Sequence, residues 1–234
     1  MTFQKHIDAA YNAAITEYSD MIDPFQPGFI REFQISKNMG HTLIMGKKGK
    51  DAIDGKGKQV EYKTFSLGGW GELNAQLDIG FEHLLQDTDY WIFAEFDSPF
   101  SISRLWRVEM SKISEQCKQA FQTTKKKNGH IMIHFRISWI EKNGTAIEVS
   151  SDPGESVFIS ELRKAQKIAS TDFGVGDITL KGRIREILIA EKLGHEIIVG
   201  SKDADAKDKS GAIFEYLTSK HGKFQVTHLT ETNM

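Results

Sequence analysis

Apolar residues at helical spacing mark the N-terminal part of the chain. A helix is predicted over 3–20 by apolar side chains three and four positions apart, namely Phe3, Ile7, Ala10, Ala14 and Tyr18. A second helix is predicted over 29–39, and Gly40 directly after it suits a left-handed C-cap. His41 then follows a helix end, where a hydrogen-bond donor is favoured. A structural role for His41 is therefore preferred to metal binding.

After residue 40, stretches in which apolar and polar residues alternate are interspersed with stretches of apolar residues at helical spacing. Runs rich in branched and aromatic residues predict strands at 42–45, 89–96, 103–108, 130–140, 145–149, 196–199 and 213–218. Helical spacing predicts helices at 73–85, 110–121, 161–169 and 183–193. Interspersed elements of both kinds predict an α/β (mixed α+β) fold in which helices cover the sheets.

The chain repeats itself. Residues 29–64 align with 183–218 without a gap, and nearly half of the aligned positions are identical. Among the identical pairs are Glu32 with Glu186, Gly40 with Gly194, His41 with His195, Asp51 with Asp205, Asp54 with Asp208, Glu61 with Glu215, and Tyr62 with Tyr216. We interpret this as an internal duplication. No residues follow the second copy that match 72–150, so this copy is expected to be incomplete or the chain to be cut.

The repeat and its surroundings predict two domains. Ser151-Asp152-Pro153-Gly154 gathers polar and chain-breaking residues just before the second copy. The expected domains are therefore 1–150, with the first copy, and 151–234, with a degenerate partial repeat of the same core.

Composition restricts the kind of protein. The formal net charge of the 234 residues is −2, so the chain has no overall basic signature. A single cysteine, Cys117, rules out an internal disulfide framework and suits a reducing compartment. No apolar run is long enough to span a membrane, and the N-terminus lacks the apolar core of a signal peptide. We therefore expect a cytoplasmic protein without a membrane partner.

The run 50–63 carries the strongest chemical signal. Asp51 enters a turn rich in Gly and Lys, and the strand that leaves the turn carries Glu61 and Lys63. Alternate strand residues share a face, so Glu61 and Lys63 project together, roughly 6–7 Å apart. A hairpin would place Asp51 opposite them. Two carboxylates and one ammonium suit a divalent metal such as Mg²⁺ beside a phosphate.

This arrangement resembles the PD-(D/E)xK nucleases, which include many type II restriction endonucleases. Asp51, Glu61 and Lys63 stand at the motif positions, with Lys50 in place of the usual proline. The resemblance covers 29–65 well and the rest loosely. It implies a restriction-endonuclease-like core, a central mixed sheet flanked by helices. It also implies metal ligation by Asp51, Glu61 and the Tyr62 carbonyl, with Lys63 orienting the attacking water. In some relatives a helix Glu, here Glu32, completes the site.

Other interpretations of the same residues stay open. Asp54 is an alternative metal ligand, but the turn dipeptide Asp54-Gly55 explains it well. The hairpin lysines are either DNA-phosphate contacts or a solvated face; they are Lys47, Lys48, Lys56 and Lys58. The whole hairpin is alternatively an exposed, charged turn. In the second copy Leu217 replaces Lys63, so that site is expected to be impaired.

The sequence thus predicts a Mg²⁺-dependent endonuclease that cleaves double-stranded DNA, most simply a site-specific type II restriction enzyme. The alternatives are a nuclease-derived DNA-binding or regulatory protein that does not cut, and an RNA-directed or repair nuclease with the same core. A homodimer and a monomer with pseudo-dimeric halves both fit a chain with one competent site.

Overall fold

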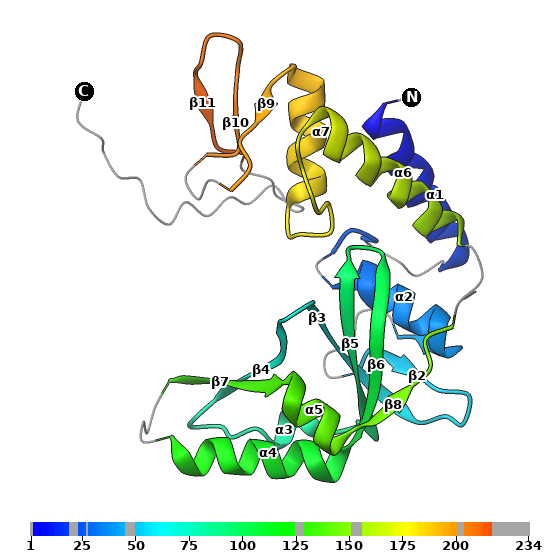
Figure 1. Ribbon diagram of the computed structural model, residues 1–234, viewed down its shortest axis with the longest axis vertical. Helices are drawn as coiled ribbons and strands as arrows, with labels where there is room; N and C mark the ends of the chain where they lie inside the picture. The colour runs from blue at the N-terminus through cyan, green and yellow to red at the C-terminus, as the bar shows by residue number, and fades with distance from the viewer. Residues whose placement is uncertain are drawn as a thin grey trace. The chain divides into compact units, whose positions relative to one another are not determined.

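A six-stranded mixed sheet is the centre of the computed structural model (Figure 1). In spatial order its strands are β1 (Thr42–Leu43), β2 (Ala52–Ile53), β3 (Gln59–Ser66), β5 (Tyr90–Ser98), β6 (Ser101–Glu109) and β8 (Thr145–Ile147). β3 and β5 run parallel, and the other neighbours run antiparallel. Helices flank this sheet, so the expected mixed α and β fold with a central mixed sheet is confirmed.

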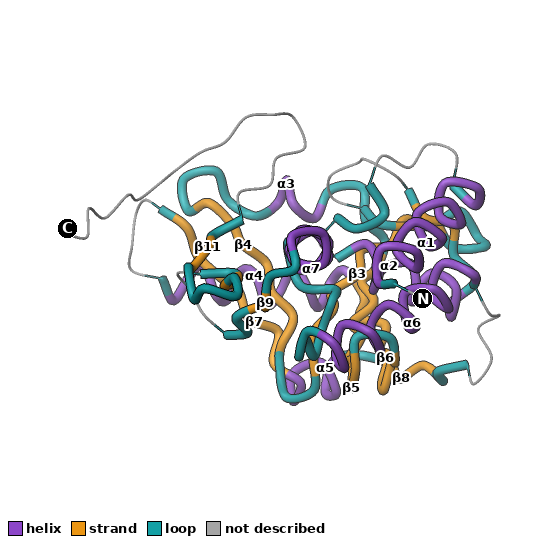
Figure 2. Tube along the Cα trace, turned by 90° about the horizontal axis from the view of Figure 1, so that it is seen from above, coloured by secondary structure: helices purple, strands orange, loops and turns teal. Residues whose placement is uncertain are grey.

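Contacts divide the chain into two compact units. The larger unit is Ala9–Arg163, and the smaller unit combines Met1–Asp8 with Lys164–Met234. The division falls inside the helices α1 (Phe3–Glu17) and α6 (Val157–Asp172). The structure describes residues 2–18, 23–26, 28–44, 50–124, 129–150, 156–200 and 204–216, and the remainder is grey in Figure 2. The expected domain boundary at 151–154 lies outside the described residues.

Four further helices belong to the larger unit. They are α2 (Phe29–Met39), α3 (Glu82–Leu85), α4 (Met110–Thr123) and α5 (Ile137–Asn143). α2 has the predicted bounds and ends at Gly40 in the left-handed conformation, with φ 66°. It buries Phe33, whose ring meets Phe158 of α6 edge-on with 5.1 Å between centroids. Apolar spacing along α2 therefore fixes the face that it turns inward.

A two-stranded ribbon, β4 (Trp70–Gln76) paired with β7 (His130–Arg136), lies beside the main sheet. Its side chains alternate between a buried and an exposed face. The helix predicted over 73–85 is therefore wrong, because pairing with β7 selects the two-residue period of this segment. Only the short α3 is helical within that range.

The strand predicted over 130–140 is also partly wrong. β7 ends at Arg136, and the next residues form α5. The three-residue spacing of Ile137 and Ile140 allows both to face the core, and Ile140 is fully buried. The apolar residues of 130–140 fit the two-residue period of a strand and, near the end, also the spacing of a helix. Packing against the rest of the fold therefore decides which part is strand and which part is helix.

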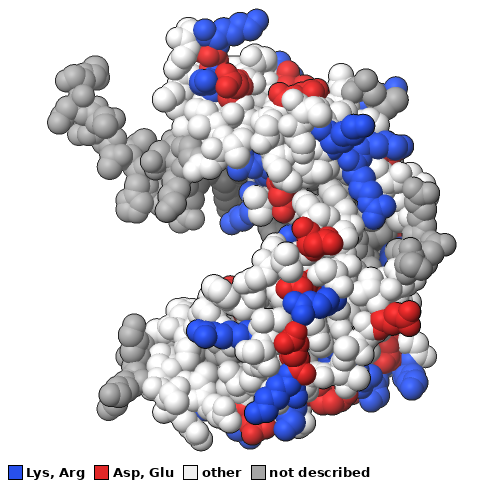
Figure 3. Space-filling view, in the orientation of Figure 1, with Lys and Arg blue, Asp and Glu red and all other residues white. Residues whose placement is uncertain are grey.

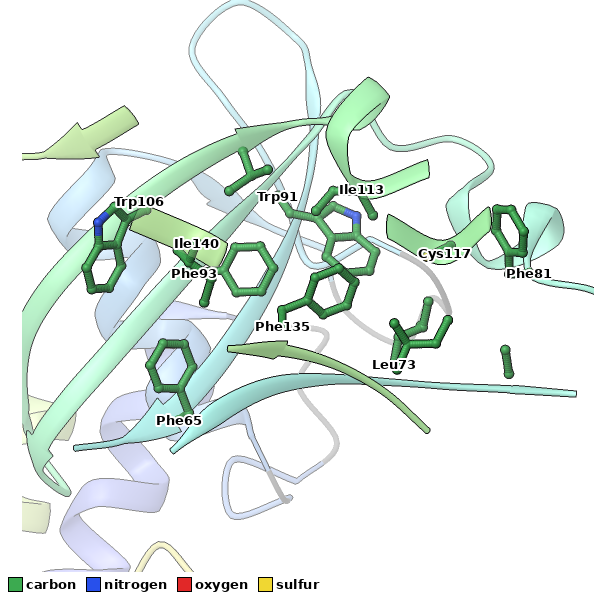
Figure 4. Close-up of a cluster of buried hydrophobic side chains, with 13 residues drawn as sticks. Phe65, Leu73, Phe81, Trp91, Phe93, Trp106, Ile113, Cys117, Phe135 and Ile140 are labelled. Atoms are coloured by element: carbon green, nitrogen blue, oxygen red, sulfur yellow. The ribbon is translucent and has the colours of Figure 1, made fainter. Parts of the chain in front are cut away.

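The core of the larger unit fills the angle between the sheet, the ribbon and α4 (Figure 4). Three aromatic rings meet at its centre: the Phe135 centroid is 5.5 Å from that of Trp91 and 5.4 Å from that of Phe93. α4 contributes Ile113 and Cys117. Cys117 is fully buried and burial raises the pKa of its thiol to about 12, so the cysteine serves packing.

The smaller unit contains α7 (Arg183–Leu193), with the bounds predicted from the sequence. A three-stranded antiparallel sheet follows, in the order β11 (Ile213–Phe214), β10 (Ala206–Lys207), β9 (Glu196–Ile197). The start of α1 belongs to this unit: the Phe3 and Gln4 backbone N–H groups donate to the Glu191 carboxylate at 2.9 and 3.0 Å. These bonds satisfy two donors that every helix N-terminus leaves open.

Gly71 provides a test of the core packing. A Cβ on this residue of β4 would lie 2.6 Å from Cε1 of the buried Phe93 ring. Gly71→Ala should therefore lower the free energy of unfolding by about 1–3 kcal/mol in urea titrations. Gly55→Ala is the matched control, since a Cβ there meets nothing within 4 Å. Equal stability of the two variants would contradict the close approach of β4 to β5.

Candidate active site

The predicted hairpin exists, and Asp51 fastens its two sides. The Asp51 N–H donates to the Val60 carbonyl at 2.9 Å, where β2 pairs with β3. The Asp51 Oδ2 accepts the Tyr62 N–H at 2.6 Å. The N–H and C=O of one strand residue point to the same edge, so the Tyr62 carbonyl is directed to the Asp51 side of β3. Asp51, which directly precedes β2, thereby extends the strand pairing by one residue.

Glu61 and Lys63 project from the same face of β3, as predicted. The Lys63 Nζ donates to Glu61 Oε1 at 2.6 Å. The two side chains are 16% and 19% exposed, so the pair is neither sealed nor freely solvated. The Lys63 ammonium also lies 5.0 Å from the centroid of the Trp91 ring, which favours a cation. The side chains are therefore held in place rather than extended into solvent.

Glu32 joins this group from the first turn of α2. Gly28 precedes the helix with φ 90°, and a Cβ on it would lie 2.7 Å from the Glu32 Oε1. The glycine thus leaves room for the carboxylate to fold back over the helix N-terminus, where a negative charge is favoured.

The carboxylates crowd one another. Burial, then the charges of Asp51 and Glu61, raise the pKa of Glu32 to about 8. Burial, then the charge of Glu61, raise the pKa of Asp51 to about 7. One ammonium, Lys63, opposes both shifts. Three acids facing one cation leave an excess of negative charge, which a divalent cation would relieve.

One carboxylate oxygen of this site lacks a hydrogen-bond partner. Within the described residues, the Glu61 Oε2 is buried and accepts no hydrogen bond. A buried carboxylate oxygen without a donor is costly and suits a cation. No three His, Cys, Asp or Glu side chains in the described ranges already form a metal shell. The predicted ligand set does not require three, because it consists of Asp51, Glu61 and a backbone carbonyl.

His41 has the structural role that its position suggested. Its Nδ1 lies 2.8 Å from the Tyr62 Oη, and its N–H donates to the Ser36 carbonyl at 2.9 Å. Tyr62 is therefore tied to the end of α2 by its side chain and to Asp51 by its backbone. This connection links the helix that carries Glu32 to the strand that carries Glu61.

Asp54 has a structural role in the turn between β2 and β3. Its Oδ1 accepts the backbone N–H groups of Lys56 and Lys58 at 2.8 and 2.9 Å, and its Oδ2 accepts the Tyr90 hydroxyl at 3.0 Å. These bonds lower the pKa of Asp54. Asp54 therefore shapes the turn, and Asp51 remains the candidate ligand.

Two of the four lysines predicted to contact DNA lie within the described residues. Lys56 and Lys58 are exposed on the turn, while Lys47 and Lys48 lie outside the described residues. On the face shown in Figure 3, Lys and Arg side chains are interspersed with Asp and Glu side chains. On this face, attraction of a nucleic acid would therefore depend on local groups rather than on a broad basic patch.

The second hairpin repeats the contacts of the first. The Tyr216 N–H donates to Asp205 Oδ2 at 2.6 Å, and His195 Nδ1 lies 2.9 Å from the Tyr216 Oη. Asp208 holds the turn by accepting backbone N–H groups, as Asp54 does. Gly194 ends α7 in the left-handed conformation, as Gly40 ends α2.

The charges differ between the two hairpins. Glu186 of α7 forms an ion pair of 2.9 Å with Arg183 of the same helix, whereas the residue aligned with Arg183 in the first copy is Phe29 of α2. Glu215 is exposed, and Leu217, which aligns with Lys63, lies outside the described residues. In the second copy, therefore, an arginine of the same helix pairs with the helix carboxylate, whereas in the first copy the charge of Lys63 on the hairpin opposes the raised pKa of Glu32. The comparison of the two copies in the sequence did not identify this ion pair, although Arg183 stands three residues before Glu186 on the predicted helix.

Comparison with known proteins adds no relative: no protein-family model matches the chain, and no curated protein matches it significantly. Among the described residues, no helix is both long and apolar enough to cross a membrane.

The crowding of carboxylates predicts a pH dependence of stability without metal. The pKa of Glu32 rises from 4.5 in the unfolded chain to about 8 in the folded one, so ionisation favours unfolding. In EDTA the melting temperature should therefore fall as pH rises from about 4.5 to about 8. Glu32→Gln should reduce this fall, and the exposed Glu115→Gln should not. Equal slopes for all three proteins would show that Glu32 is not buried among like charges.

Proposed function

We propose that this chain is a Mg²⁺-dependent endodeoxyribonuclease of the PD-(D/E)xK type, acting as a restriction enzyme in the cytoplasm. The observation that carries the proposal is the convergence of Asp51, Glu61 and Lys63 on one hairpin. Their chemical types match the needs of phosphodiester hydrolysis: oxygen ligands for a hard cation, and an amine for the phosphate.

The residues fit a magnesium ion. Asp51 and Glu61 offer carboxylate oxygens, one of them buried without a hydrogen bond, and the Tyr62 carbonyl faces the edge where Asp51 lies. Mg²⁺ binds such oxygens and retains several of its waters. When bound, the metal would polarise the phosphate and make a coordinated water more acidic. Glu32 would accept a hydrogen bond from such a water or complete the ligand set.

Lys63 has the capacity for a second contact. Its ammonium carries three N–H donors, and the Glu61 carboxylate accepts one of them. The remaining donors are available to a phosphate oxygen or to the attacking water. A donor held in place before the reaction stabilises developing charge without reorganising, and such a contact typically contributes about 10²–10³-fold to the rate.

The second hairpin is proposed to be a degenerate copy that does not cleave. The repeated bonds at Asp205, Tyr216 and His195 support a common origin of the two segments. The leucine at position 217 provides no donor, and the ion pair of Arg183 with Glu186 offsets part of the negative charge that a metal would otherwise balance. A chain with one competent site must nick, cut twice in succession, or act as a homodimer. Alternatively, the second copy stands in for the other subunit in a pseudo-dimeric monomer.

Lys63 separates this proposal from a nuclease-derived DNA-binding protein that does not cut. Lys63→Ala should lower Mg²⁺-dependent nicking of supercoiled plasmid by about 10²-fold or more, while circular dichroism shows an intact fold. Lys118→Ala, on the exposed side of α4, is the matched control and should retain activity. Undiminished cleavage by Lys63→Ala would refute the assigned role. Binding of plasmid without nicking by the unmodified chain would favour the regulatory protein, and a panel of RNA and damaged DNA would identify a different substrate.

Metal binding can be tested without cleavage. Asp51→Asn keeps an oxygen that accepts the Tyr62 N–H and removes only the charge. At a Mg²⁺ concentration of about ten times Kd, the melting temperature of the unmodified protein should rise by roughly 2–5 °C. Asp51→Asn should show a smaller rise, and in EDTA it should be at least as stable as the unmodified protein, because a crowded buried charge is gone. Identical Mg²⁺ shifts for both proteins would exclude Asp51 as a ligand.

A further inference from the structure

The exposed face of the β4–β7 ribbon has a composition unusual for a solvated surface. β4 turns Trp70, Asn74 and Gln76 outward, and β7 turns out His130, His134 and Arg136. The Trp70 indole, 45% exposed, stacks on the His134 ring at 5.2 Å with 13° between planes. The opposite face of the ribbon packs Leu73, Ala75, Ile133 and Phe135 into the core. One face is therefore fixed by packing, and the other holds side chains that form hydrogen bonds, together with the exposed Met132 opposite Asn74.

The register places these side chains in cross-strand pairs. Trp70 lies opposite Arg136, Glu72 opposite His134, and Gln76 opposite His130. Successive pairs on one face are separated by roughly 6.8 Å, which is about two base-pair steps of B-DNA. The Glu72 carboxylate accepts the Trp70 indole N–H at 2.7 Å and lies 3.9 Å from the His134 Nε2. The only acid of this face is thus engaged with its neighbours, and Arg136 supplies a full positive charge.

The ribbon is joined directly to the candidate active site. β3, which carries Glu61 and Lys63, leads through a turn at 67–69 into β4. A Cβ built on Gly71, which belongs to the buried face of the ribbon, would lie 3.5 Å from the Lys63 Cβ, so the start of the ribbon lies beside the base of the lysine side chain. In Figure 1, α4 runs along the ribbon. Ile113 and Cys117 of this helix pack with the ribbon's buried face, which leaves the hydrogen-bonding face on the side away from α4.

We propose that the exposed face of the β4–β7 ribbon enters the major groove of duplex DNA and reads base edges next to the phosphate held at Lys63. This inference rests on the proposed nuclease function and names its specificity surface. The major groove admits a two-stranded β-ribbon. Asn and Gln pair with adenine edges and Arg with guanine edges, so Asn74, Gln76 and Arg136 are the reading residues.

The test compares cut sites and bound sites. Sequencing of the DNA ends left by the unmodified chain should reveal a preferred sequence. Asn74→Ala/Gln76→Ala should lower the preference at one or more positions about tenfold, the scale of one lost base contact. Arg136→Lys keeps the charge and loses the planar fork, so it should alter base preference while largely keeping affinity. Gln119→Ala/Gln122→Ala, on the exposed side of α4, is the matched control and should keep the sequence preference.

The outcomes distinguish the ribbon from the nuclease. If the unmodified chain cuts DNA and the ribbon variants retain its sequence preference, the ribbon inference is overturned and the nuclease proposal stands. If the chain does not cut, selection of random-sequence duplexes bound by full-length Lys63→Ala protein decides the inference. An enriched sequence that disappears on adding the ribbon substitutions supports it. An unchanged sequence, no enrichment, or tighter binding of the corresponding RNA duplex overturns it.

Discussion

The hydrogen bond from the Tyr62 N–H to the Asp51 carboxylate is the constraint on which the candidate site depends. It extends the pairing of β2 with β3 to the residue before β2 begins, and it sets Asp51 beside the strand that carries Glu61 and Lys63. Its 2.6 Å counterpart at Asp205 and Tyr216 shows that the same bond holds a hairpin whose lysine position is a leucine. The presence of this Asp and Tyr in both copies is therefore explained by their role in holding the hairpin. The presence of Lys63 in the first copy requires a different explanation.

The two copies share their hydrogen bonds but differ in how the charges of their buried carboxylates are compensated. In the first hairpin, Glu32 and Asp51 both have raised pKa values because they are buried beside Glu61 and face one ammonium. In the second, burial raises the pKa of Glu186, but Arg183 opposes that shift through a direct ion pair. An uncompensated buried carboxylate destabilises a fold, so its retention at Glu32 favours a functional reason. At Glu186 the ion pair with Arg183 offsets part of this cost.

Chemistry and recognition are proposed to share one rigid element. β3 holds Glu61 and Lys63, and after a three-residue turn the chain returns as β4 against the Phe93 ring. On β5, Trp91 lies beside Glu61 of β3 and Phe93 lies beside Lys63. The Trp91 and Phe93 rings also pack on Phe135 of β7. The aromatic core thus fixes the ribbon with respect to the reacting groups. A site built on packed strands is held more closely than one built on loops.

The sequence by itself determined the local features. Periodicity and a glycine C-cap gave the bounds of α2 and α7, turn chemistry gave the role of Asp54, and spacing put Glu61 and Lys63 on one face. These features depend on residues a few positions apart. Tertiary structure alone decided that 70–76 is a strand, because its partner β7 lies more than fifty residues away in the chain. It likewise decided where β7 ends and α5 begins, and that the charges of Asp51 and Glu61 act on Glu32. Each of these outcomes depends on burial and on charges brought together by folding, which a local pattern does not encode.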